Sequence, residues 1–294
     1  MRPARPVPSE LASGPFSRAT ALAHVTDRTL GGPAYRSLTR GVHAARELPV
    51  DHGVRILAAR AALGEHAVVS GASAAWVWGA QLAAPDEPAT MTVSRHVRQR
   101  RELRVREDVL RAGEVVVTAR WGLTTTPART AYDLGRVRSL TTAVQHLDAL
   151  TATTRVTPDD VLACTAGRPG SRWITTLRTA LELTDPGAES PRESALRVLL
   201  VTAGLPRPAT QVVVRDVAGF FVARVDLGWP DLRVAVEYDG QHHDLPEQVR
   251  KDRARLNRPR VAGWTVIVVD RHQMRRPDDV VATVAAALRA ARGR

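Results

Sequence analysis

The segment QVVVRDVAGFFVARVDLGWPDLRVAVEYD, residues 211–239, decides the fold of the last third of the chain. It contains three strand-like runs, at 211–216, 220–227 and 232–239, separated by the turn-prone residues VAG and GWPD. Turns this short predict an antiparallel meander. Farther along, WTVIVVD at 264–270 is a continuous apolar run, which is typical of a strand covered on both faces.

Acidic side chains gather near the end of this meander. The two-residue period of a strand places Glu237 and Asp239 on the same face of the third run. A tight turn at GWPD would set Asp226, from the second run, across from Glu237. Neighbouring carboxylates repel one another unless a cation lies nearby or they are fully exposed. The pattern therefore indicates either a hard-oxygen site suited to Mg²⁺ or Mn²⁺, or a solvated strand end whose acids pair with arginines.

A metal at this position, beside a basic surface, points to phosphodiester hydrolysis, because the cation polarises the scissile phosphate and lowers the pKa of a bound water. His242 and His243 follow in the next loop. One of them could act as the general base or bind a phosphate, and otherwise both are surface residues. Arg255 could bind phosphate or form an ordinary ion pair with Asp252, three positions earlier.

Glu193 has two interpretations. Ser190-Pro191-Arg192-Glu193 is a capping box at the start of a helix that Gly204 closes, with Ser190 as the N-cap residue. The capping box accounts for Glu193 without any chemistry. In the functional alternative, the Glu193 carboxylate reaches toward the metal.

The charge of the chain points to a polyanionic partner. The 294 residues include 42 Lys and Arg against 30 Asp and Glu, which gives a formal net charge of +12. Lys251 is the only lysine, so the bias also fits codon composition. Residues 95–106, RHVRQRRELRVR, carry six arginines. We assign Arg98, Arg100 and Arg101 to nucleic-acid phosphates, with a solvated loop rim as the alternative.

Composition excludes several classes of protein. A hydrophobic fraction of 44% is too high for wholesale disorder, and the length fits two or three domains. One cysteine, Cys164, cannot form an internal disulfide or a Cys-based zinc finger. The first 17 residues lack the apolar core of a signal peptide, and no run reaches transmembrane length, so we expect a cytoplasmic protein.

The chain divides into three predicted regions, 1–60, 61–187 and 188–294, of overall mixed α/β class. In the first, the helical patterns FSRATALAHV (16–25) and PAYRSLTRGVH (33–43) predict a small winged-helix-like unit. There, Arg40-Gly41-Val42-His43 turns into the wing strand.

The second region is predicted to be mixed and mainly helical, with a loop-rich stretch around Pro85, Pro88 and the arginine cluster. Thr126 is the expected N-cap of a helix whose first residue is Pro127. Further helices are predicted over 138–152, 157–165 and 171–184, and in the third region a charged helix near Glu247 and a last one over 277–292.

The motifs of the third region resemble a known nuclease family. ESPRESALRVLLVTAGLP, RVDLGWP, VAVEYDGQHH, KDRAR and AGW, over about 188–275, are similar to the DUF559 family, a Vsr-like branch of the PD-(D/E)XK endonuclease superfamily. The resemblance implies a central mixed sheet with flanking helices and a divalent-metal site. It matches Asp226 and Glu237 to the two metal carboxylates and Glu193 to the acidic residue of the first helix. His242 and His243 fall where such enzymes place active-site histidines.

The chain departs from that family at two points. Asp239 stands where the superfamily usually has a lysine, and Lys251 is either a migrated replacement or an ordinary surface lysine. Pro259 lies where similar sequences have a helix leucine. Because proline inside a helix costs ~3 kcal/mol, the helix is expected to end or kink near Arg258.

The first two regions resemble AbiEi-type antitoxins of type IV toxin–antitoxin systems over about 16–150. The stretches that carry this resemblance are SLTRGVHAA, VVSGASAAWVWG and GLTTTPARTAYDLGR. It implies an N-terminal winged helix that binds DNA, a helical domain and a toxin partner. TTTPARTAYDL is expected to have a structural role at the start of a helix, because it contains no pattern of nucleophile and base.

Three functions follow from these observations. The first is a metal-dependent DNA endonuclease guided by the N-terminal region. The second is a non-catalytic, antitoxin-like DNA-binding regulator with a degenerate nuclease domain, which the missing lysine favours. The third is an RNA-processing nuclease, since a basic channel and a metal do not by themselves select DNA.

Overall fold

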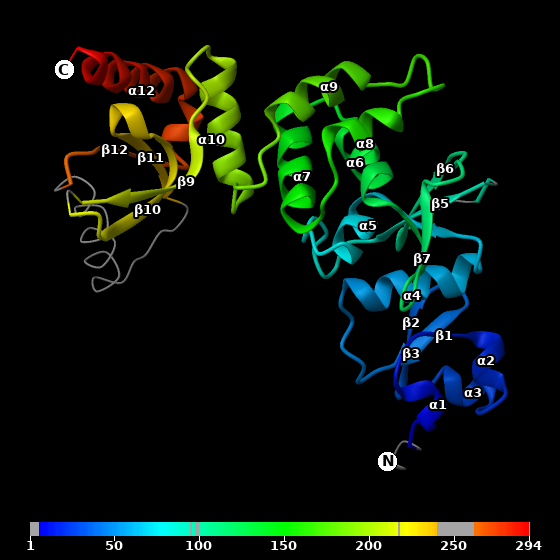
Figure 1. The fold of residues 1–294 in the computed structure, drawn as a ribbon. Coiled ribbons are helices and arrows are strands. Elements are labelled where there is room, and N and C mark those ends of the chain that lie inside the picture. Colours follow the sequence, from blue (N-terminus) through cyan, green and yellow to red (C-terminus); the bar gives the residue numbers. More distant parts are fainter. Residues whose placement is uncertain (1–5, 95, 98–99, 217, 240–261, 294) are drawn as a thin grey trace. The chain divides into compact units, whose positions relative to one another are not determined.

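The computed structural model describes residues 6–94, 96–97, 100–216, 218–239 and 262–293. The protein is mixed α/β, as predicted, and its described part contains three separate sheets (Figure 1). The chain forms two compact units, one of Met1–Arg136 with Thr153–Arg172 and one of Val137–Ala152 with Trp173–Arg294. The predicted boundaries at residues 60 and 187 stay predictions. No helix in the described residues is long and apolar enough to span a membrane.

The first unit begins with three short helices and a three-stranded antiparallel sheet. Its elements, in chain order, are α1 (Ser9–Ala12), β1 (Phe16–Ser17), α2 (Arg18–Leu22), α3 (Asp27–Leu30), β2 (Tyr35–Thr39) and β3 (Val42–Ala45). The strands form an antiparallel sheet in the order β1-β3-β2, and Arg40 and Gly41 make the tip of the β2–β3 hairpin. Gly41 has a φ of +78°, which glycine adopts without strain.

The helical pattern predicted at 33–43 is wrong, because Tyr35–Thr39 is a strand. Tyr35 and Thr39 are both buried. A spacing of four residues satisfies both the helical and the strand period, so it does not distinguish the two structures. Phe16–Ser17, predicted as part of a helix, also pairs with β3.

The rest of the first unit combines a five-stranded sheet with helices. Its elements are α4 (His52–Leu63), β4 (Val68–Val69), α5 (Gly71–Val77), β5 (Ala89–Val93), β6 (Leu103–Glu107), β7 (Val115–Thr118), β8 (Gly122–Thr125), α6 (Pro127–Gly135) and α8 (Pro158–Ala163). The sheet order is β6-β5-β4-β8-β7. β5 and β6 lie in a stretch predicted to be rich in loops. In β6, exposed arginines alternate with the buried Leu103 and Val105, which is the two-residue period of a strand. The many charges of this segment made it look like a loop in the sequence.

The second unit contains the predicted meander. Its elements are α7 (Leu140–Thr153), α9 (Ile174–Leu183), α10 (Pro191–Thr202), β9 (Ala209–Arg215), β10 (Phe221–Trp229), η1 (Pro230–Leu232), β11 (Val234–Asp239), β12 (Thr265–Asp270), η2 (Gln273–Arg275) and α12 (Pro277–Arg292). β9, β10 and β11 are antiparallel neighbours, and β12 joins β11 in parallel. Residues of α10 and α12 pack on one face of this sheet around Leu227 and Val236 (Figure 1).

A buried ion pair joins α7 to α10. Arg197 Nη2 donates to Asp148 Oδ2 at 2.6 Å, and the two side chains are 0% and 2% exposed. The Ser194 hydroxyl and the Asp185 backbone N–H donate to the same carboxylate, at 2.6 and 2.7 Å. Because its partners come from separate segments, the Asp148 carboxylate links α7 to the turn at Asp185 and to α10.

Removing one member of this pair is expected to destabilise the second unit strongly. Asp148→Ala leaves the Arg197 guanidinium buried without its carboxylate, which costs on the order of 3–5 kcal/mol. Arg224→Ala is the matched control, because the Arg224–Glu189 pair is about half exposed on both sides. An exposed pair contributes less than about 1 kcal/mol. Urea unfolding would measure both, and equal losses would contradict the assignment.

Candidate functional site

The predicted carboxylate site lies where β10 and β11 meet. The register pairs Leu227 with Val236, so one further step places Asp226 opposite Glu237. Glu237 is buried, at 3% exposure, and Asp226 is half-buried. Asp226 Oδ2 accepts a hydrogen bond from the Tyr238 backbone N–H at 2.8 Å. The expected antiparallel arrangement of β10 and β11 is confirmed. One carboxylate oxygen of Asp226 is already engaged in the hydrogen bond with the backbone of β11.

The third predicted ligand, Asp239, lies at the exposed end of β11. The parallel register sets it beside Asp270 of β12, an acidic residue that the sequence analysis did not single out. Asp270 Oδ1 accepts from the backbone N–H groups of His272 and Gln273, which begin the turn after β12. The sequence did show that Asp270 ends the apolar run at 264–270. The parallel pairing of β12 with β11 cannot be deduced from that run, because the two strands are distant in the sequence.

The described residues do not complete a metal site by themselves. Among them, no group of three or more His, Cys, Asp or Glu side chains is arranged to hold a metal ion. Asp226 and Glu237 supply hard oxygens of the kind that Mg²⁺ and Mn²⁺ prefer. The other predicted functional residues of this region lie outside the described part of the chain: His242, His243, Lys251 and Arg255. Mg²⁺ or Mn²⁺ binding therefore stays a prediction.

Glu193 is held at the start of α10. The Ser190 hydroxyl accepts from the Glu193 backbone N–H at 3.2 Å, which confirms Ser190 as the N-cap. Glu193 Oε2 accepts from the backbone N–H of Glu189 at 3.0 Å and from Gln211 Nε2 at 2.9 Å. Gln211 reaches it from β9 with a φ of +50°. The described contacts thus form the Ser190 half of the predicted capping box, whereas the Glu193 carboxylate accepts from Glu189, one residue before the N-cap, and from Gln211.

Part of the predicted arginine cluster lies beside the wing. Arg100 Nη1 donates to the backbone carbonyl of Arg40, at the tip of the β2–β3 hairpin, over 3.4 Å. Arg101 is exposed in the turn that precedes β6. Arg98 lies outside the described residues. The contact between Arg100 and Arg40 places two positively charged segments of the first unit next to each other.

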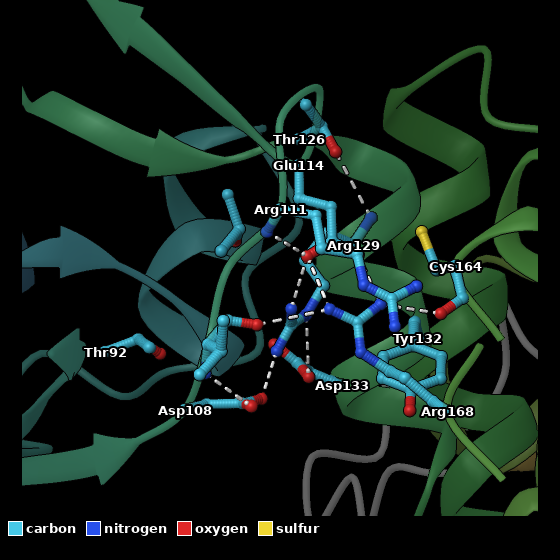
Figure 2. A network of polar contacts seen from close by, with 12 residues as sticks. Thr92, Asp108, Arg111, Glu114, Thr126, Arg129, Tyr132, Asp133, Cys164 and Arg168 are labelled. Atoms are coloured by element: carbon cyan, nitrogen blue, oxygen red, sulfur yellow. Dashed lines mark hydrogen bonds and ion pairs between the residues drawn. The ribbon is translucent and has the colours of Figure 1, made fainter. Parts of the chain in front are cut away.

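A buried arginine network occupies the middle of the first unit (Figure 2). Arg129 of α6 is 1% exposed and donates to three carboxylates: Nη1 to Glu114 at 2.7 Å, Nε to Asp133 at 3.2 Å and Nη2 to Asp108. Arg168 also binds Glu114 through both terminal nitrogens. The network joins the segment after β6, the start of β7, α6 and the turn after α8.

This network explains the motif TTTPARTAYDL in physical terms. The Thr126 hydroxyl accepts from the Arg129 backbone N–H at 3.3 Å, and Pro127 opens α6, so the predicted cap is confirmed. Arg129 and Asp133 are one helical turn apart and pair with each other. The motif therefore forms the capped start of α6 and contributes Arg129 and Asp133 to the buried network.

Charge–charge contacts set the ionisation of Glu114. Burial alone would raise the pKa of this carboxyl. The hydrogen bonds from Arg168, the Arg111 backbone N–H and Arg129 outweigh burial and lower the Glu114 pKa to about 2. The carboxylate is therefore the stable form at neutral pH, with Arg129 as its buried partner.

Comparison with known proteins supports one of the two predicted resemblances. Residues 66–183 match the family described as the AbiEi antitoxin C-terminal domain. The stretches VVSGASAAWVWG and GLTTTPARTAYDLGR lie within this match. The DUF559 resemblance of the third region stays a prediction.

Two curated relatives come from Mycobacterium tuberculosis. The uncharacterized proteins MT2308 (strain CDC 1551 / Oshkosh) and Rv2248 (strain ATCC 25618 / H37Rv) are each 33% identical to this chain over 172 residues. The match covers 58% of this chain and 63% of each relative, so the chain spans less than two thirds of their length. The crystal structure of the RV2827C protein from Mycobacterium tuberculosis is similar with a TM-score of 0.41 and 16% identity, covering 68% of this chain and 79% of that one.

Glu114→Gln is expected to reduce the loss of stability in acid. The Glu114 pKa is about 2 in the folded protein against an ordinary 4.5. The unfolded chain therefore binds this proton first as the pH falls. Its contribution to stability is present above about pH 4.5 and is lost toward about pH 2, by about 3 kcal/mol in total.

Urea unfolding at a series of pH values would measure this effect as the difference between wild type and Glu114→Gln. The exposed Glu65→Gln is the control, and it should follow the wild-type curve. If Glu114→Gln loses stability between about pH 5 and about pH 2 as steeply as wild type does, the Arg129 network does not depend on this carboxylate.

Proposed function

We propose that this chain is an antitoxin-like, non-catalytic DNA-binding regulator. The observation that carries the proposal is the winged-helix arrangement of residues 9–45 in the same compact unit as residues that match the AbiEi antitoxin family. A winged helix presents one helix to the major groove and a hairpin to the adjacent backbone. The formal net charge of +12 favours such a polyanionic partner.

The helix that would enter the groove is α3. Thr26 caps it by accepting from the Thr29 backbone N–H, and Arg18 holds Asp27, its first residue, through two hydrogen bonds of 2.9 and 2.7 Å. The Thr26 cap supports the start of α3, and Arg28 lies exposed on this helix, where it can contact DNA.

The wing and the arginine loop would bind the sugar-phosphate backbone. Arg40 is exposed at the wing tip, and Arg100 contacts its carbonyl from the loop before β6. Arginines so placed neutralise phosphates and set the register of the protein on the duplex, without reading the bases. Arg101, which is exposed beside Arg100, extends this surface.

A toxin partner is part of the same proposal. It rests on the match of residues 66–183 to the AbiEi antitoxin C-terminal domain family. Membership of a toxin–antitoxin pair predicts that the chain relieves the growth inhibition caused by a toxin encoded beside it.

Substituting arginines of α3 and of the wing is expected to weaken DNA binding. Arg28→Ala and Arg40→Ala should each lower affinity by about tenfold and reduce the salt dependence of binding by about one phosphate equivalent. Fluorescence anisotropy with duplexes selected from a random pool, at several salt concentrations, measures both quantities. Arg155→Ala is the control, because Arg155 is an exposed arginine of the same unit outside the winged helix. Equal losses in all three variants would mean that only overall charge matters.

A second candidate function is divalent-metal-dependent hydrolysis of DNA. The register that brings Asp226 opposite Glu237 on adjacent strands favours it. If Mg²⁺ or Mn²⁺ binds there, Asp226 and Glu237 would be its protein ligands, and the ion would activate water and stabilise charge on the phosphate. The lysine that usually assists is replaced by Asp239, which is why we rank this function second.

Plasmid nicking in Mg²⁺ or Mn²⁺ decides between the two functions. The nuclease predicts nicking that Asp226→Ala abolishes and that Asp231→Ala, an exposed acid in the nearby η1, leaves unchanged. The regulator predicts no metal-dependent cleavage of duplex DNA, single-stranded DNA or RNA. It also predicts that Glu237→Gln, which keeps the shape of a buried side chain, retains full DNA affinity.

A further inference from the structure

Positive charge gathers on one side of the arginine network, where the exposed Arg111 adjoins it. Arg129 is satisfied by three carboxylates, and Arg168 shares one of them, Glu114. The ion-paired members of the cluster are three arginines (Arg129, Arg136 and Arg168) and three acids (Asp108, Glu114 and Asp133). Arg111 is exposed and joins the cluster through its backbone N–H, which donates to Glu114, so its guanidinium is an additional positive charge beside the balanced set.

Arg136 is only loosely paired with its acid. Its side chain is 21% exposed, and its Nη2 lies 3.6 Å from Asp133 Oδ1, beyond hydrogen-bond distance. Its Nε is buried without a hydrogen-bond partner in the described part of the chain. The guanidinium carbon lies 4.1 Å from the centre of the Tyr132 ring, which holds the group in place. An acceptor at this position would therefore meet an ordered donor.

A pocket of about 460 Å³ opens at this point, entirely within the first unit. Arg111, Tyr132, Arg136, Arg168 and Ser171 line it, together with Asp108, whose carboxylate already binds Arg129. The Ser171 hydroxyl donates to the Arg168 carbonyl at 2.9 Å, and the Tyr132 hydroxyl, 3.0 Å from Ser171 Oγ, is placed to donate to it. The lining thus offers three guanidinium groups against one acid that is already paired.

We infer that this pocket binds a phosphate group. Arginine presents parallel N–H donors that match two oxygens of a phosphate, and the Arg136 fork lacks such a partner. The Arg111 and Arg168 guanidinium groups are anchored by the backbone carbonyls of Gly167 and Cys164, at 2.7 Å each, so they cannot swing away from the pocket. A phosphate would bring negative charge to the three guanidinium groups that line the pocket.

The phosphate has two potential sources, a free nucleotide and the backbone of nucleic acid. The inference does not depend on the proposed function, because the pocket is built from residues of α6 and of the turns around Arg111 and Arg168, none of them in the winged helix. A free nucleotide would make the chain responsive to a small molecule. A backbone phosphate would make the pocket a second anchor on bound DNA.

Calorimetric titration with inorganic phosphate and with a nucleoside 5′-monophosphate, at constant ionic strength set by chloride, tests this site. Wild type is expected to bind one phosphate per chain. Arg136→Gln should raise the dissociation constant at least about tenfold, and Arg136→Lys, which keeps the charge and loses the fork, should lie between the two. Arg155→Gln removes the same charge from an exposed arginine outside the pocket and should bind as wild type does.

Competition with duplex DNA identifies the source of the phosphate. If saturating duplex prevents nucleotide binding and Arg136→Gln also weakens DNA affinity, the ligand is the backbone. If both bind together, the ligand is a free nucleotide. Absence of phosphate binding to wild type, or equal weakening in Arg136→Gln and Arg155→Gln, overturns the site. Circular dichroism and Arg136→Lys separate loss of the site from loss of the fold, and the Arg28 and Arg40 variants test the winged helix independently.

Discussion

The buried guanidinium of Arg129 is the constraint on which the first unit depends. A permanently charged group with 1% exposure is compatible with a stable fold only when acids surround it on every side. The three acids come from separate segments, after β6, before β7 and within α6. Each of these segments must therefore reach its place for the charge to be satisfied. The requirement couples local conformation to the complete fold, and it positions Arg168 and Tyr132 as a consequence.

The sequence predicted the features that depend on neighbouring residues. The turn-prone residues between the runs at 211–239 were sufficient to predict the antiparallel meander of β9, β10 and β11. The caps at Thr126 and Ser190 followed from residue type and spacing. Each of these predictions rests on interactions within a few residues, for which periodicity and turn chemistry carry enough information.

The features that the sequence did not predict join distant segments. Arg100 meets the carbonyl of Arg40 across 60 positions, and Arg197 meets Asp148 across 49. No spacing rule connects such residues, because their separation depends on the whole path of the chain. The strand at Tyr35–Thr39 was missed for a different reason, since its two buried residues fit either period. The neighbours of the candidate carboxylates could not be predicted either, because residues such as Asp270 come from a strand that is distant in the sequence.

The ion pair between Asp148 and Arg197 has a bearing on how the chain can be divided. The segment that matches the antitoxin family ends at residue 183, while the partner of its buried aspartate lies fourteen residues beyond that end. A fragment cut after residue 187 would keep the acid, lose the base, and also lose the serine that donates to it. In such a fragment the surface of α7 that contacts α10 would be exposed, with Asp148 unpaired. Soluble expression of the family-matched portion therefore requires α10 as well.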